Sequence, residues 1–117
     1  MNTFETGRGR TRLTFTWQYW GDDLHVHIAG GRHHIGAVAL AGRDPSGQAY
    51  LHALAVPPHK EDQMVLRAAR ALHEALGVTV CVTGGVHLGD ITWEEISTVL
   101  QNADEGVGHL LRTLEKE

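Results

Sequence analysis

The sequence predicts an α+β domain in which helices cover one face of a largely antiparallel sheet. Three observations support this. Short segments up to residue 57 alternate apolar and polar residues, as strands do. The apolar spacing then changes to that of a helix, and a short apolar run and a capped second helix follow. The predicted order is therefore ββββαβα, in one domain of residues 1–117 with residues 1–10 as a flexible lead-in.

Four strands are expected in the first half of the chain. "RLTFTWQYW" (12–20) and "LHVHIA" (24–29) each alternate, and "GDD" between them turns the chain, which predicts an antiparallel hairpin. "HIGAVALAG" (34–42) and "AYLHALAVP" (49–57) flank the turn sequence "RDPSGQ". Strands that follow one another in this way predict a meander.

Two helices and one more strand are expected in the second half. "HKEDQMVLRAARALHEALG" (59–77) has helical apolar spacing, and Gly77 is a suitable C-terminal stop. "VTVCVTGG" (78–85) is continuously apolar, which is typical of an interior strand. "TWEE" (92–95) is a capping box, and we expect glycines 106 and 108 to break the helix that it starts.

A homodimer is expected from the distribution of apolar residues. Trp17, Tyr19 and the strands rich in small residues offer apolar area on both sides of the sheet. Two helices cover only one side well, so a second subunit would cover the other.

Composition excludes several classes of protein. Apolar residues make up 42% and charged residues 21%, as in ordinary globular proteins. No run approaches the ~20 apolar residues of a membrane span, and the start lacks a signal peptide's apolar stretch, so we expect a cytoplasmic protein without a membrane partner. A net charge of −4 argues against a nucleic-acid partner. Arg8, Arg10 and Arg12 are expected to be solvated, with a binding arm as the alternative.

Neither a catalytic nucleophile nor a complete metal site is evident. There is no G-x-S-x-G, Ser46 and Ser97 fall in a turn and a helix, and Cys81 lies within an apolar strand. His25 and His27 share a strand face and could chelate a metal, but no third ligand accompanies them. We therefore predict no catalytic or metal-binding residue, although nine histidines keep a small metal-dependent hydrolase or lyase open as an alternative.

Three other histidines lie where regular structure meets a turn. His34 follows the glycine pair 30–31, His59 opens the first helix, and His87 follows the glycine pair 84–85. Glycines allow close approach of the backbone, and helix starts present N–H groups with partial positive charge. If these corners converge, they form an anion site with Lys60 close by. Tight turns would equally account for the glycines.

Three segments carry a resemblance to a known family: "GGRHHIGAVALA", "LAVPPHKEDQMVLRAARAL" and "GGVHLGDITWEEISTVLQNAD". From about residue 22 onward the chain resembles the LpdD-like prenylated-flavin chaperones, small accessory proteins encoded with gallate-type decarboxylases. The resemblance implies a dimer similar in fold to proteasome-assembly chaperones. It also implies a non-catalytic protein that carries reduced prenylated FMN and delivers it to a decarboxylase of the UbiD type.

The glycine pair and the matching motif positions are the expected cofactor-binding residues: Gly30, Gly31, His34, Gly36, His59, Lys60, Glu61, His87, Asp90 and Thr92. We hypothesise that Lys60 and nearby amides hold the phosphate, while His34 and His87 contact the rings or the ribityl chain. A decarboxylase accessory subunit that binds no small molecule is a further alternative.

Overall fold

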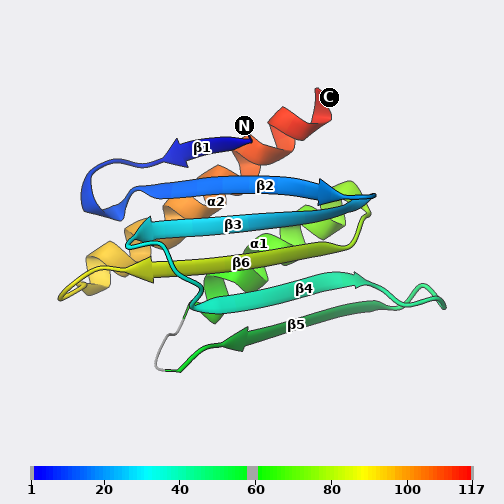
Figure 1. Cartoon of the computed structure of the whole chain (residues 1–117), viewed down its shortest axis with the longest axis horizontal. Coiled ribbons are helices and arrows are strands. Elements are labelled where there is room, and N and C mark those ends of the chain that lie inside the picture. Colours follow the sequence, from blue (N-terminus) through cyan, green and yellow to red (C-terminus); the bar gives the residue numbers. More distant parts are fainter. Residues whose placement is uncertain (1, 58–60, 117) are drawn as a thin grey trace.

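A computed structural model describes residues 2–57 and 61–116 of the chain. Its elements are β1 (Thr3–Thr6), the short 3-10 helix η1 (Gly9–Thr11), β2 (Leu13–Trp20), β3 (Asp23–Gly31), β4 (Ala37–Arg43), β5 (Ala49–Ala55), α1 (Asp62–Leu76), β6 (Val80–His87) and α2 (Trp93–Glu115). They form a six-stranded sheet in the order β1-β2-β3-β6-β4-β5, with α1 and α2 behind it (Figure 1). The predicted α+β class is confirmed.

The strand order corrects the predicted meander. β2 and β3 form the expected hairpin and β4 pairs with β5, but β6 lies between β3 and β4. It runs parallel to β3 and antiparallel to β4, with Val82 opposite both Val26 and Ala39. Helix α1 supplies the long connection that a parallel return requires. The central position buries Val80 and Val82 completely, so the expectation of an interior strand is confirmed.

Residues at the N-terminus, which we expected to be flexible, form strand β1, so the observed order has one strand more than predicted. Thr3–Thr6 pairs antiparallel with β2. The ring of Phe4 stacks on that of Phe15 with centroids 5.0 Å apart. Thr6 donates a hydrogen bond to the Asn102 carbonyl, which ties the strand to α2. These contacts offset the entropic cost of ordering a chain end.

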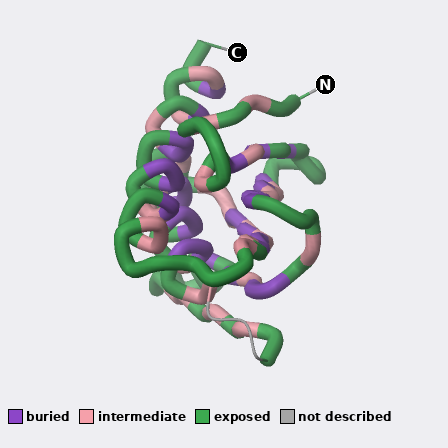
Figure 2. The backbone as a smooth tube through the Cα atoms, turned by 90° about the vertical axis from the view of Figure 1, so that its left-hand side faces the viewer, coloured by how far each residue is buried: buried purple, intermediate pink, exposed green. Residues whose placement is uncertain are grey.

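Both helices pack on the same face of the sheet, as predicted, with α1 against β4, β5 and β6 and α2 against β1 and β2. Figure 2 shows the buried residues concentrated between the helices and the sheet. The largest fully buried side chains belong to Phe15, Leu13, Leu24, Ile28, Leu72 and Leu110. The apolar alternation of β2 and β3 therefore identified their core-facing residues correctly except for Tyr19, which is 42% exposed.

The end of α1 and the start of α2 are as expected. Helix α1 is described from Asp62, whereas its expected first residue, His59, lies outside the described residues, and the predicted break in α2 is wrong. Gly77 adopts φ 72° at the end of α1, and its N–H bonds the His73 carbonyl. Thr92 and Glu95 form the predicted capping box. Helix α2 then continues through Gly106 and Gly108 to Glu115. Gly106 is buried against Phe15, so its lack of a side chain serves packing between helix and sheet.

The opposite face of the sheet is covered by none of the described helices. Strand registers place on it His25 and His27 from β3, Cys81 and Thr83 from β6, Val38 and Leu40 from β4, and His52 and Leu54 from β5. We call this set the open face. Leu54 is 72% exposed and Leu40 40% exposed. The face therefore presents an apolar strip of Val38, Leu40 and Leu54 over β4 and β5, with His52 opposite Leu40, whereas His25 and His27 lie on β3, beyond β6.

Candidate functional site

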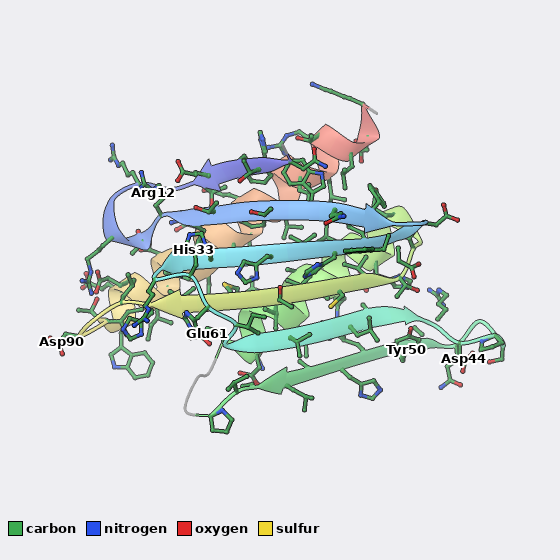
Figure 3. The ribbon with its side chains drawn as sticks, viewed as in Figure 1. Arg12, His33, Asp44, Tyr50, Glu61 and Asp90 are labelled. Carbon is green, nitrogen blue, oxygen red and sulfur yellow. The ribbon has the colours of Figure 1, made fainter. Side chains whose placement is uncertain are left out.

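The motif residues that the structure describes gather at one end of the sheet. Strands β3 and β6 end there, β4 begins there, and both helices begin beside them (Figure 1). In Figure 3, Arg12, His33, Glu61 and Asp90 all lie toward this end, whereas Tyr50 and Asp44 lie toward the other. We call it the site end of the molecule.

A cavity of about 570 Å³ opens at the site end, within the size range of small-molecule sites. The end of β6, the first turn of α1 and the first two turns of α2 form its walls. The lining is mainly apolar, with three polar side chains, and consists of Glu61, Gln63, Met64, Val86, His87, Leu88, Ile91, Trp93, Ile96, Val99 and Leu100. Such a surface favours a flat, mostly apolar molecule that needs a few polar contacts for orientation.

Two of the three predicted histidine corners meet beside this cavity. The rings of His34 and His87 are perpendicular, with centroids 6.2 Å apart. Nδ1 of His34 lies 2.8 Å from the Arg32 carbonyl oxygen and donates to it, which fixes the tautomer of a neutral ring. His59 and Lys60 lie outside the described residues.

The predicted glycines hold three chain segments close together. A Cβ on Gly85 would lie 2.8 Å from Cε1 of His34, so the imidazole rests on the Gly85 backbone. Gly31 has φ 68°, and a Cβ there would meet the His87 carbonyl oxygen. Gly30 is packed against Leu13 and Val86, and Gly36 bonds into the sheet through its N–H and its carbonyl. These glycines therefore allow neighbouring segments of the chain to pack closely against one another.

The remaining motif residues fall at the α-helix starts. Glu61 lines the cavity and is the N-cap of α1. Thr92 is the N-cap of α2, and its hydroxyl accepts a hydrogen bond from the Glu95 N–H. Asp90 is exposed, with φ 50° in the turn before that cap. The neighbours Ile91 and Trp93, and not Asp90 and Thr92, line the cavity.

Trp93 is a functional candidate that the sequence reasoning missed. It is 86% exposed and borders the cavity. An exposed indole at the rim of a mainly apolar cavity offers a large, flat contact surface to a ligand. The sequence did contain a sign of this role, because Trp93 directly follows the cap residue Thr92. An aromatic residue in the first turn of a helix lies next to any cavity at the start of that helix.

A smaller cavity of about 310 Å³ lies at the same end, and Leu88 borders both cavities. Its lining is mainly polar and consists of Glu5, Gly9, Arg10, Arg12, Thr14, Ala29, Gly31, His33 and Leu88. Arg10 is exposed, as expected of a solvated arginine, but it also forms specific contacts. Its guanidinium pairs with Glu95 and donates to the Gly89 carbonyl oxygen over 2.6 Å.

Groups on the open face are poor candidates for catalysis. Burial raises the pKa of the Cys81 thiol, which keeps it protonated and weakly nucleophilic. His25 and His27 point to the same face, as predicted, and both contact the Thr83 hydroxyl, at 3.1 and 2.7 Å. Burial, followed by the charges of nearby imidazoles, lowers the pKa of His27. Over residues 2–57 and 61–116, no three His, Cys, Asp or Glu side chains are grouped as metal ligands would be.

Comparison with known protein families identifies the family of this chain. The prenylated flavin chaperone LpdD-like domain matches residues 7–115. The chain belongs to this family. No curated protein matches this member of the LpdD-like chaperones.

The fold of this LpdD-like protein is similar to that of a chain in the "Crystal Structure of a Novel Chaperone Complex for Yeast 20S Proteasome Assembly". The TM-score is 0.51 at 7% sequence identity, over 91% of this chain and 97% of that one. At this identity the likeness concerns the fold alone, and it confirms the expected similarity to proteasome-assembly chaperones. Neither of the helices described for this LpdD-like chain has the length and hydropathy to cross a membrane.

Proposed function

We propose that this protein holds reduced prenylated FMN in the larger cavity at its site end and delivers it to a UbiD-type decarboxylase in the cytoplasm. Membership of a prenylated flavin chaperone family supports the cofactor. The observation that carries the proposal is the cavity itself, because its apolar walls and its volume of about 570 Å³ suit a fused ring system.

The lining residues fit the cofactor's chemistry. Met64, Val86 and Leu100 offer apolar contacts to the rings, and Trp93 offers a stacking surface at the rim. His87 and Gln63 offer hydrogen bonds to ring heteroatoms or to hydroxyls of the ribityl chain. The prenylated flavin supplies decarboxylation chemistry once it reaches an enzyme. This chain's residues bind it, orient it and exclude water, so we propose a carrier and not an enzyme.

His34 positions His87, one of the residues that line the cavity. Its ring packs between the Gly85 backbone and the edge of His87, so it fixes the direction in which His87 faces the cavity. A carrier must also release its cargo. Micromolar affinity corresponds to about −8 kcal/mol and leaves room for transfer to an enzyme that binds more tightly.

The open face supports a homodimer. Val38 and Leu54 are opposite each other on β4 and β5, and Leu40 lies beside them. In a monomer these apolar side chains would be exposed to water, so a second copy is the proposed cover. The larger cavity lies at the ends of the strands, away from the middle of the open face. It would therefore stay open to solvent in the dimer.

Anaerobic titration with reduced prenylated FMN tests the proposal. The wild-type protein is expected to bind in the micromolar range and to transfer the cofactor to an apo-decarboxylase. His87→Ala should strongly weaken binding while the thermal unfolding curve stays nearly unchanged, since His87 lines the cavity and is exposed. Wild-type protein that binds no flavin would instead favour an accessory subunit without a ligand, and unaltered binding by His87→Ala would place the site elsewhere.

A further inference from the structure

A flavin phosphate needs positive charge, and the described helix starts do not offer it. Glu61 and Asp62 lie at the start of α1, and Glu94 and Glu95 lie in the first turn of α2. The capping box also uses the hydrogen-bonding groups of Thr92 and Glu95. A dianion at either start would face carboxylates, which oppose the attraction of the helix dipole.

Among the described residues, the arginines that line a cavity at the site end lie around the smaller one. Arg10, Arg12 and His33 line it together with one carboxylate, Glu5. None of the described residues that line the larger cavity is an arginine or lysine. The cationic and apolar parts of the site end are therefore separate, and Leu88 is the side chain that they share.

The two arginines differ in how firmly they are held. Arg10 is bound on two sides, by Glu95 and by the Gly89 carbonyl, so its guanidinium is fixed between η1 and the loop before α2. Nε of Arg12 lies 3.4 Å from Glu5 Oε2, and both side chains are more than half exposed. Exposed pairs of this kind contribute little stability, so Arg12 can exchange Glu5 for a better anion.

We infer that the smaller cavity binds the phosphate of a flavin whose rings occupy the larger cavity, with the ribityl chain passing Leu88. The inference rests on the proposed function. Arg12 leaves Glu5 and grips the phosphate through two parallel N–H donors, a geometry that guanidinium groups favour. Arg10 lines the cavity while the Glu95 carboxylate compensates its charge, so Arg12 carries the main electrostatic attraction, and His33 adds a further N–H donor. This assignment differs from the hypothesis that Lys60 holds the phosphate.

A comparison of two ligands tests the subsite: reduced prenylated FMN and the same compound after removal of its phosphate. Both are titrated anaerobically into the wild-type protein and into Arg12→Ala. The variant is expected to bind the phosphorylated ligand about ten- to hundredfold more weakly, because it loses charge-assisted hydrogen bonds. Binding of the dephosphorylated ligand should not change. Arg43→Ala, an exposed arginine on β4 beside the β4–β5 turn, is the matched control.

A second variant gives an effect of opposite sign. Glu5→Gln removes the competing carboxylate and should strengthen binding of the phosphorylated ligand alone, which a merely structural role for Arg12 and Glu5 would not produce. The phosphate subsite would be overturned if Arg12→Ala lost affinity equally for both ligands. It would also be overturned if Lys60→Ala, and not Arg12→Ala, lost affinity for the phosphorylated ligand alone. Wild-type protein that binds neither ligand would contradict the proposed function itself, so the two failures are distinguishable.

Discussion

Gly106 of α2 lies directly on the aromatic ring of Phe15 of β2. A Cβ at this position would be 2.9 Å from Cδ1 of Phe15 and closer still to two other ring atoms. Since Phe15 is fully buried, its ring has no free space into which to move. The contact sets how closely α2 approaches the sheet.

Gly106→Ala should therefore destabilise the protein, although alanine is the better helix former. Overpacking of this kind costs about 1–3 kcal/mol, which lowers the melting temperature by several degrees. The matched control is Gly108→Ala, whose Cβ would meet only the end of Arg112 at 3.4 Å. It should stabilise the protein by about 0.5–1 kcal/mol. Thermal unfolding of both variants checks the prediction. A Gly106→Ala protein that melts at the wild-type temperature would show that the contact with Phe15 does not limit the packing of α2 on the sheet.

Trp93→Ala is expected to weaken binding of reduced prenylated FMN by about tenfold or more, because it removes the aromatic surface at the cavity rim. Unfolding should be nearly unaffected, since the side chain is 86% exposed. Trp20→Ala is the control, because Trp20 is 64% exposed and ends β2 at the hairpin, at the far end of the sheet. Equal affinities for the two variants in an anaerobic titration would remove Trp93 from the site.

Leu54→Asp should convert the proposed homodimer to a monomer, since it puts a charge into the apolar strip of the open face. Light scattering coupled to size-exclusion chromatography measures the change. Trp93→Asp places the same charge on an even more exposed apolar residue outside the strip and should leave the dimer intact. A wild-type protein that elutes as a monomer would contradict the homodimer itself.

Acidification should destabilise the protein partly through His27. Its pKa is lowered in the folded state, chiefly by burial, so below about pH 6.5 the unfolded state binds the proton first. The free energy of unfolding therefore falls as the pH falls through this range. His27→Asn should lose less melting temperature between pH 7.5 and pH 5.5 than the wild type does. His52→Asn, which alters an exposed imidazole on the same face, is the control, and identical pH profiles for all three proteins would refute the assignment to His27.

Local sequence patterns specified the parts of the site but not their arrangement. The motif around residues 84–92 correctly placed a strand end, a turn and a capped helix in succession. It drew attention to Asp90 and Thr92, whereas Ile91 and Trp93 are the residues that line the cavity. A motif marks positions along the chain, and the direction of each side chain depends on the backbone turn, here with φ 50° at Asp90.

The sequence by itself determined most of the residues that face the core, the end of α1 and the start of α2, and which family the segments resemble. These properties depend on contacts between near neighbours along the chain, such as the bond between Thr92 and Glu95 or the left-handed backbone of Gly77. Tertiary structure alone decided that β6 enters between β3 and β4, that Thr3–Thr6 adds a strand, and that α2 continues past Gly106. Alternation assigns a residue to a face of the sheet but not to a neighbouring strand. That choice depends on which distant segments bury the most apolar surface together, and it is also what brings His34 beside His87.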